Sequence, residues 1–215
     1  MRARQRSSTA FEIKSLPLFA SLGLPSYDVE GFLKYAKNIF VENEPLWMTL
    51  KYHGCSGRAV FHNGEFHVGS RKEWKREFAT PPLMTDKIKE TVRVRAKTPE
   101  EAEERINNLQ AKFNEWKPSQ NLWWKVLRGD ENLQKFLKDN LDVAVYGEVI
   151  PVQGDKFKYG QNPQKPVLKV FDIMVKGRWL DAQEARDFAP TLNWVHCFYK
   201  DFPFNQEKLI EFVEN

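Results

Sequence analysis

Three polar residues interrupt or end apolar, strand-like stretches of the chain, and they are the first candidates for chemistry. Lys51 follows the apolar run at 46–50, Glu148 interrupts the run at 142–150, and Asp172 lies in the middle of the run at 167–175. Taken singly, such residues are usually solvated. Taken together, their residue types provide an amine and two carboxylates, which can act as a nucleophile and as ligands of a divalent cation.

A short motif surrounds each of these residues. The first motif is Lys-x-His-Gly at residues 51–54, which includes His53 and Gly54 and lies at a strand-to-loop turn. Three further motifs follow in chain order: Gly-Ser-Arg at 69–71, Tyr-Gly-Glu at 146–148 and Val-Phe-Asp-Ile at 170–173. The arginine, Arg71, is planar and permanently charged, so it can bind a phosphate through two parallel hydrogen bonds.

In this order the motifs resemble the covalent nucleotidyltransferase superfamily, which contains polynucleotide ligases and mRNA capping enzymes. Most branches have aspartate in the third position of the first motif. The histidine found here resembles the residue of the RNA ligase 2-like branch at this position. The stretch at 68–74 and the Asn-Leu-Trp-Trp stretch at 121–124 also resemble that branch. The resemblance covers roughly residues 40 to 215.

The resemblance implies a reaction and a role for Lys51 in it. A ligase of this kind transfers AMP from ATP to a lysine, passes it to an RNA 5′-phosphate, and joins that end to a 3′-hydroxyl. By similarity, Lys51 is the residue that carries AMP, and it must lose its proton to attack. The glycine, Gly54, allows a close backbone approach to the nucleotide. Arg71 is expected to bind a phosphate or the RNA end.

The remaining site residues are also assigned by similarity. Glu148 is expected to contact the ribose and a divalent metal, Phe171 to stack on the adenine, and Asp172 to act in the later steps. Mg²⁺ suits carboxylate, phosphate and water oxygens, so Mg²⁺ is the expected ion. We place His53 among the residues that bind ATP, and the pattern leaves open whether its side chain is catalytic or solvated.

Two features depart from the family pattern. Leu50 stands where the branch usually has a glutamate that reads the adenine amino group. The Glu-Gly and Lys-x-Lys motifs expected after Ile173 are missing, and the segment at 203–209 resembles the stretch that normally precedes them. We therefore expect an adenylyltransferase domain over residues 1–215 that stops before the last two motifs. The chain is then truncated, split or degenerate, and a second polypeptide or a C-terminal segment would supply those motifs.

Other residues carry weaker signals. His62 and His67 stand at the two ends of a predicted hairpin without a third ligand nearby, so we expect no metal site there. The pair Trp123 and Trp124 is better explained by core packing than by base stacking.

Composition agrees with a globular protein. The 215 residues are 41% hydrophobic and 29% charged with a net charge of +4, which fits a polyanionic partner without proving one. Cys55 and Cys197 show no metal-ligand spacing. The basic start at 1–8 lacks the apolar core of a secretory signal, and no apolar run reaches the roughly 20 residues that span a bilayer. We expect a cytoplasmic protein without a membrane partner.

The elements that must position these residues follow from local patterns. Asn63 and Gly64 predict a tight hairpin between strands at 58–62 and 65–68. A strand at 46–50 precedes it, and together the three suggest an antiparallel meander. Further predicted strands lie at 91–95, 142–150 and 167–175, and predicted helices begin near residues 98, 121, 181 and 205, the second ending near 139.

These elements indicate an α+β fold. By the resemblance, it is the nucleotidyltransferase fold, with two antiparallel sheets flanked by helices and the nucleotide between the sheets. The predicted function is an ATP-dependent RNA ligase acting on RNA ends or a nicked RNA duplex. The alternative is a catalytically incomplete RNA- or nucleotide-binding module derived from such a ligase. The Lys-x-His-Gly motif argues against a capping guanylyltransferase.

Overall fold

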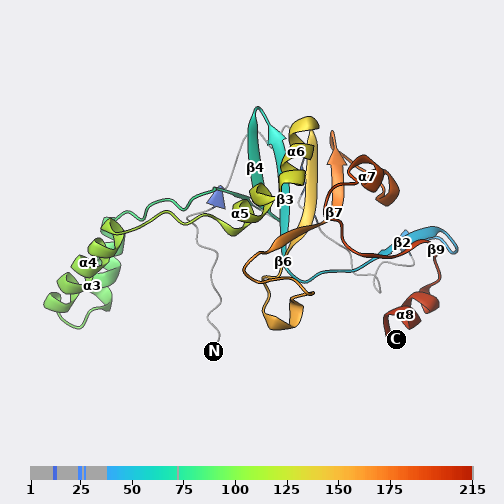
Figure 1. Cartoon of the computed structure of the whole chain (residues 1–215). Helices are drawn as coiled ribbons and strands as arrows, with labels where there is room; N and C mark the ends of the chain where they lie inside the picture. Colours follow the sequence, from blue (N-terminus) through green and yellow to red (C-terminus); the bar gives the residue numbers. More distant parts are fainter. Residues whose placement is uncertain (1–11, 14–23, 26, 28–37, 72, 215) are drawn as a thin grey trace.

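The computed structural model describes residues 12–13, 24–25, 27, 38–71 and 73–214 (Figure 1). The basic start at 1–8 lies outside the described residues. The described part of the chain contains no helix that is both long enough and apolar enough to cross a membrane.

A seven-stranded antiparallel sheet forms the centre of the molecule. β3, β6 and β7 are its longest strands and lie side by side (Figure 1). In sheet order, the strands are β1 (Glu12–Ile13), β5 (Trp74–Lys75), β4 (Glu65–Ser70), β3 (Cys55–His62), β6 (Val143–Ile150), β7 (Val167–Val175) and β8 (Arg178–Trp179).

The hairpin between β3 and β4 is confirmed. Asn63 and Gly64 both have positive φ, at 50° and 81°, as a type I′ turn requires. His62 pairs with Glu65 across the turn and Val60 pairs with His67. No group of three or more metal-ligating side chains occurs among the described residues, these histidines included.

The predicted three-stranded meander is wrong. β2 (Pro45–Thr49) pairs instead with β9 (Cys197–Pro203) in a separate two-stranded antiparallel sheet. A strand has only two edges, and β4 and β6 occupy both edges of β3. β2 therefore has no place beside β3, and residues 50–54 connect one sheet to the other.

Within the part of the chain that the structure describes, four helices adjoin the sheets. The predicted helix at 121–139 is two helices, because Asp130 has an extended conformation and caps the second with a hydrogen bond from the Leu133 amide to its carboxylate. The predicted helices near 181 and 205 are confirmed. The bounds are α5 (Leu122–Gly129), α6 (Glu131–Asp139), α7 (Ala182–Phe188) and α8 (Gln206–Glu214), with a 3₁₀ turn η2 (Asp155–Phe157) after β6.

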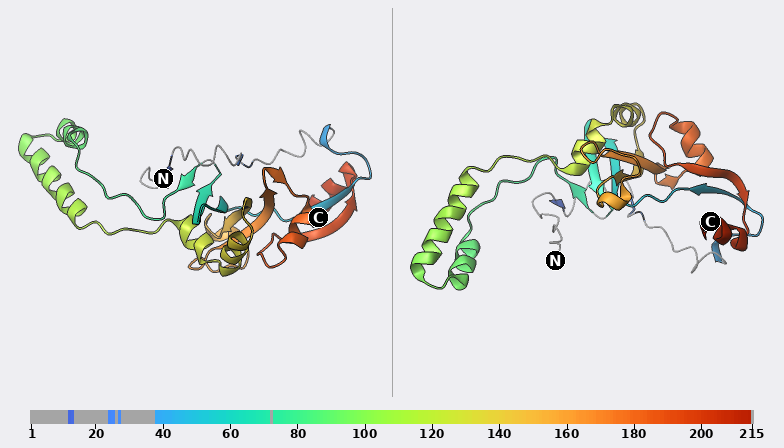
Figure 2. Two further views of the ribbon diagram at one scale, coloured as in Figure 1. Left: turned by 90° about the horizontal axis from the view of Figure 1, so that it is seen from above. Right: turned by 60° about the horizontal axis from the view of Figure 1, so that its bottom comes forward.

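A helical arm, consisting of α3 (Asp86–Arg95) and α4 (Pro99–Asn114), lies apart from the sheet at the end of two extended segments (Figures 1 and 2). The predicted strand at 91–95 is wrong, since these residues form the second half of α3. The Thr85 side chain caps this helix by accepting a hydrogen bond from the Ile88 amide. Capping thus outweighs the weak β-propensity of the valines. α4 begins at Pro99 as predicted.

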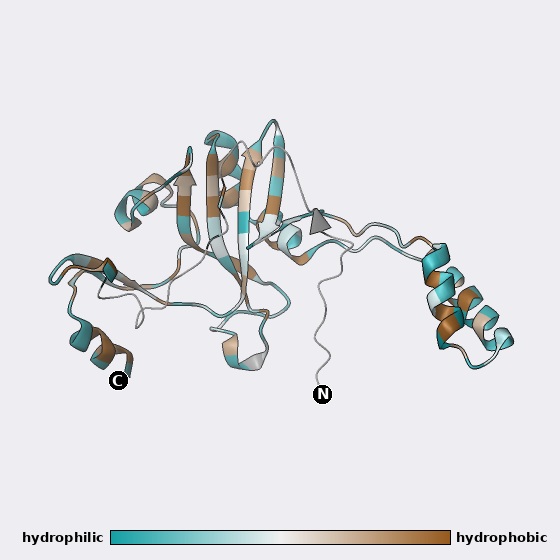
Figure 3. Cartoon of the chain, turned by 180° about the vertical axis from the view of Figure 1, so that it is seen from behind, coloured by the Kyte–Doolittle hydropathy of each residue, from teal (hydrophilic) through white to brown (hydrophobic). Residues whose placement is uncertain are grey.

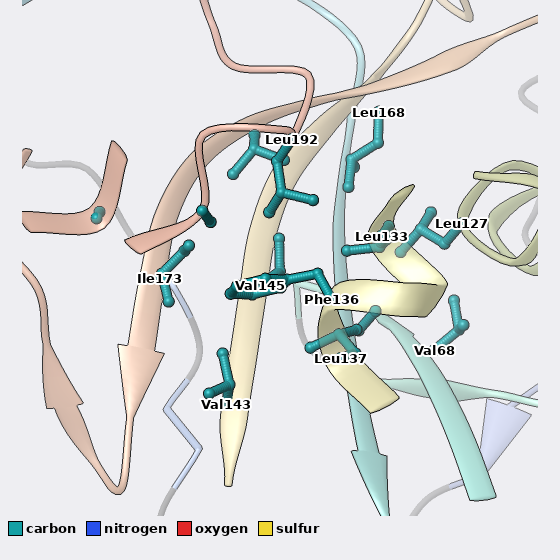
Figure 4. Packing of buried hydrophobic residues seen from close by; sticks show 14 of the residues in the cluster. Val68, Leu127, Leu133, Phe136, Leu137, Val143, Val145, Leu168, Ile173 and Leu192 are labelled. Atoms are coloured by element: carbon teal, nitrogen blue, oxygen red, sulfur yellow. The ribbon is translucent and has the colours of Figure 1, made fainter. Parts of the chain in front are cut away.

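The two faces of the large sheet have different coverings. α5 and α6 cover the face that we call the helix face (Figure 4), whose buried cluster includes Val143, Val145 and Leu133. We call the opposite side the pocket face. Its buried cluster consists of Val60, Trp74, Ala144, Tyr146 and Met174. Side chains alternate between the two faces along each strand, and Figure 3 shows the corresponding bands of hydrophobic and hydrophilic residues.

Candidate functional site

A cavity of about 1000 Å³ opens beside the pocket face, between the large sheet and the chain that leaves β2. Its walls come from both sheets and from the loops that follow β2 and β4. Five of the residues that the motifs single out line this one cavity: Lys51, Arg71, Glu148, Phe171 and Asp172. The fold therefore brings together residues that are up to 121 positions apart (172 − 51 = 121).

The pairing of β6 and β7 explains how Phe171 and Asp172 both reach the cavity. Tyr146 pairs with Asp172, but the next residue, Gly147, pairs with Val170, so Phe171 is the extra residue of a β-bulge. Two consecutive side chains of a regular strand point to opposite faces. The bulge removes this restriction, and bulges commonly re-aim side chains next to functional sites.

Glu148 is held against the loop that carries Lys51. Its Oε1 accepts a hydrogen bond of 2.8 Å from the Gly54 amide. A Cβ at Gly54 would lie 2.1 Å from the carbonyl oxygen of Val149, so only glycine fits there. Glycine is therefore required because the Gly54 backbone lies close to the backbone of β6. The sequence had instead suggested a close approach of the Gly54 backbone to the nucleotide.

The electrostatics of Glu148 reflect its position at the cavity wall. The pKa of its carboxyl group is raised by partial burial, which outweighs the opposing effects of the Gly54 amide hydrogen bond and of the nearby Lys51 and His53 side chains. The same carboxylate contributes, after burial, to a raised pKa of the neighbouring Cys55 thiol. Lys51 is exposed at the cavity, so its amine is accessible to a bound ligand.

His53 lies next to the cavity but does not line it. Its backbone amide donates to the Tyr159 hydroxyl at 3.0 Å, and its exposed ring lies 4.8 Å from the ring of Phe157, centroid to centroid. The ring of Tyr52 also contacts Tyr159, at 4.8 Å. His53 thus holds the loop after Lys51 against the segment that follows β6.

Arg71 adjoins a polar corner of the cavity that sequence reasoning missed. Here Lys75 and Glu73 form an ion pair with an Nζ–Oε2 distance of 2.7 Å, and the Lys75 side chain is only 4% exposed. Trp123 lies beside Lys75 and donates its indole N–H to the Ser56 carbonyl at 2.9 Å. Trp123 therefore packs against the core, as predicted, and also lines the cavity.

Tyr27 is another residue that lines the cavity and was not predicted from the sequence. It belongs to no motif, and no local pattern around it distinguishes it from the neighbouring sequence. Its contacts are with residues of β6, β7 and β8.

The carboxylates of the cavity suit a metal ion that is held mainly by the phosphates of a bound nucleotide. Glu148, Asp172 and Glu73 line the cavity, yet no cluster of three or more metal-ligating side chains is found among the residues that the structure describes. Mg²⁺ at nucleotide sites is commonly held by one or two carboxylates together with phosphate oxygens and water. The cavity can provide that number of carboxylates.

Comparison with known proteins identifies a family. The family model described as RNA ligase matches residues 44–212. No curated protein matches the chain. Among solved structures, Naegleria gruberi RNA ligase with PPi has 13% sequence identity and a TM-score of 0.56, with 98% of this chain and 51% of that chain covered.

Two mutant forms of the same Naegleria gruberi ligase are similarly related. An arginine-to-alanine mutant with ATP and Mn has 15% identity and a TM-score of 0.53, with 87% of this chain and 46% of that chain covered. A glutamate-to-alanine mutant with AMP and Mn has 14% identity and the same TM-score and coverage. The fold is therefore the α+β nucleotidyltransferase fold of RNA ligases, as predicted, and the chain spans about half the length of these structures.

Proposed function

Because the chain belongs to the RNA ligase family, we propose that it forms a lysyl-AMP intermediate from ATP and uses it to join RNA 5′-phosphate and 3′-hydroxyl ends. The observation that carries this proposal is the cavity itself. It gathers an accessible lysine, an arginine, an aromatic ring and two carboxylates that come from separate motifs. Residues 1–215 would then form the adenylyltransferase domain.

The first step requires an amine nucleophile beside the α-phosphate of ATP. The Nζ atom of Lys51 attacks the α-phosphorus, an N–P bond forms, and the bond to the β-phosphate oxygen breaks as pyrophosphate leaves. Pyrophosphate carries the electron pair of the broken bond, and the lysine loses its protons to solvent. Glu148 lies close enough to influence this lysine, since the charge of Lys51 affects the pKa of its carboxyl group.

The other cavity residues have complementary roles in this proposal. Phe171 offers the ring on which adenine stacks, and Arg71 binds the phosphate of the nucleotide or of the RNA end. Glu148 contacts the ribose, and Asp172 serves the steps that follow AMP transfer. The backbone amide of Gly54 keeps Glu148 in place through a hydrogen bond. His53 stabilises the loop that follows Lys51 through its hydrogen bond to Tyr159.

A divalent cation completes the proposal. Naegleria gruberi RNA ligase was solved with ATP or AMP and Mn, and we propose Mg²⁺ for this chain, held by Glu148 and phosphate oxygens. When bound, such an ion neutralises negative charge on the leaving pyrophosphate.

The partners in the proposal are RNA ends or a nicked RNA duplex. A grip on the ATP triphosphate by the Lys-x-Lys motif would come from a C-terminal segment or from a second polypeptide. The net charge of +4 fits contact with RNA phosphates.

The test is covalent labelling. Incubation with Mg²⁺ and ATP labelled in the α-phosphate is expected to label the protein, and Lys51→Ala is expected to abolish the label. Lys156→Ala, which removes an exposed lysine of η2 that does not line the cavity, serves as the matched control and should be labelled like wild type. Labelling by GTP instead of ATP would contradict the assignment as an ATP-dependent ligase.

An unlabelled wild-type protein that still shifts a nicked RNA duplex would support the alternative, an incomplete binding module. In the family that the motifs resemble, Glu-Gly and Lys-x-Lys motifs follow the Val-Phe-Asp-Ile motif. Addition of a polypeptide that carries those motifs separates the two cases, since it should restore labelling only if the cavity is competent.

A further inference from the structure

Three residues near the N-terminus lie against the pocket face, although they precede the segment at 44–212 that matches the RNA ligase family. Leu24 packs on the buried cluster of that face. The Pro25 carbonyl accepts hydrogen bonds from Arg58 Nη1 at 3.1 Å and from the Tyr146 hydroxyl at 3.4 Å. The third residue, Tyr27, reaches the cavity.

Tyr27 contacts both residues that the bulge of β7 directs to the cavity. Its hydroxyl donates a 2.5 Å hydrogen bond to Oδ2 of Asp172. Its ring lies 4.6 Å from the ring of Phe171, centroid to centroid. The rings of Trp179 and Tyr146 lie 5.3 and 5.8 Å away. Tyr27 is thus fixed by aromatic neighbours on several sides while its hydroxyl addresses one carboxylate.

The charges around this contact define what it can do. Burial raises the pKa of the Asp172 carboxyl group, and the hydrogen bond from Tyr27 lowers it. The pKa of the Tyr27 phenol is itself raised, first by burial and then by Asp172. The phenol therefore keeps its proton and donates it to the hydrogen bond, which favours the ionised carboxylate and leaves Oδ1 of Asp172 available to a ligand.

We propose that Tyr27 is a positioning residue of the nucleotide site, which holds Asp172 through its hydroxyl and packs its ring against the Phe171 ring. Tyr27 then forms part of the wall of the active site. This inference rests on the proposed function, because it assigns Tyr27 a part in binding ATP and in transferring AMP. The competing arrangement is that the Tyr27 ring occupies the place of the adenine and keeps the nucleotide out.

The key variant is Tyr27→Phe, which keeps the ring and removes the hydroxyl. Loss of a hydrogen bond to a charged group should slow transfer of AMP from Lys51 to RNA about tenfold or more, with the affinity for ATP unchanged. Removal of the donor raises the pKa of Asp172, so the acidic limb of the pH–rate profile should move to higher pH. In Asp172→Asn, the same tyrosine change should have no further effect.

Tyr27→Ala removes the ring as well, and it should weaken ATP binding about 2- to 10-fold, measured by calorimetry. Tyr199→Phe and Tyr199→Ala are matched controls, because Tyr199 is 48% exposed and does not line the cavity. If Tyr27→Phe matches wild type in rate and pH profile, the inference is wrong. Tighter ATP binding by Tyr27→Ala would show that Tyr27 closes the pocket.

The outcomes also separate this inference from the proposed function. A labelled wild type with an indistinguishable Tyr27→Phe variant overturns only the inference. A wild type that binds ATP but stays unlabelled even after addition of a polypeptide with the Glu-Gly and Lys-x-Lys motifs overturns the proposed activity. The ATP affinity of Tyr27→Ala still tests the inference in that case. A wild type that does not bind ATP overturns both. If Tyr27→Ala does not fold, Tyr27→Leu, which retains an apolar side chain, replaces it in the binding measurement.

Discussion

The two faces of the seven-stranded sheet use the same strands for different purposes. On the helix face, β6 contributes Val143, Val145 and Val149, all buried in a continuous apolar cluster. On the pocket face, the alternate residues of β6 include Tyr146 and then Glu148, whose carboxyl group has a raised pKa because it is partly buried. Both faces have a buried apolar cluster that stabilises the fold, but the pocket face also holds polar groups in a position that costs stability.

Stability and function should therefore separate along a single strand. Changes on the helix face should alter the free energy of unfolding and leave ligand affinity intact in the folded protein. Changes at residues of the pocket face that line the cavity should mainly alter ligand affinity.

The largest effect is expected on the helix face. Leu133 of α6 is fully buried, so Leu133→Ala removes apolar contacts and leaves a cavity, which should lower the free energy of unfolding by about 2–5 kcal/mol. Urea titration followed by circular dichroism measures this change. Leu141→Ala, at a position that is 62% exposed, is the control and should change stability by less than about 0.5 kcal/mol.

Nucleotide affinity completes this first test. The folded fraction of Leu133→Ala should bind ATP like wild type, because Leu133 does not line the cavity. A large loss of affinity in a protein that remains folded would show that the two faces are coupled.

A smaller effect of the opposite kind is expected at Phe171. Phe171→Ala should weaken ATP binding by about 1–3 kcal/mol, since it removes the proposed stacking ring, and should lower the free energy of unfolding by less than Leu133→Ala. Calorimetric titration with ATP measures the affinity. Phe188→Ala is the matched control, because Phe188 is 39% exposed, packs on Phe136 and does not line the cavity. An unchanged affinity in Phe171→Ala would contradict the stacking role.

The central strands could be predicted from sequence because their signals are local. β7 has the predicted bounds of 167–175, and β6 begins one residue later than predicted, at Val143. The bulge at Phe171 could not be predicted, since it arises from the register of β7 against β6 rather than from the sequence of either strand alone. The partner of β2 is likewise a long-range choice, decided by which edges of β3 are already occupied.

The site shows the same limit. Five residues that line the cavity were predicted from the sequence motifs in which they lie. Tyr27 was missed because its hydrogen bond to Asp172 spans 145 positions, and a tyrosine outside any motif carries no local signal. In the helical arm, two valines at 92 and 94 suggested a strand, whereas the cap at Thr85 decides for a helix.

The smallest change in the free energy of unfolding is expected at Glu148, and its sign distinguishes the two faces. The pKa of Glu148 is raised in the folded state, so the native protein holds this proton more tightly than the unfolded chain does. Wild type therefore loses stability as the pH rises from the ordinary carboxyl range through the raised pKa. Glu148→Gln removes the buried charge, and its neutral side chain can still accept the Gly54 hydrogen bond.

At neutral pH, Glu148→Gln should raise the free energy of unfolding by less than about 1 kcal/mol, because solvent screens the charge of this half-buried group. The same change should abolish labelling of Lys51. Thermal melts between acidic and neutral pH test the sign, since the difference from wild type should vanish at low pH and grow as the pH rises. Glu104→Gln, which changes an exposed carboxyl group of α4, should show no such trend. A destabilised Glu148→Gln would mean that attraction to Lys51 and His53 outweighs burial, so that the pocket face also gains stability from its charges.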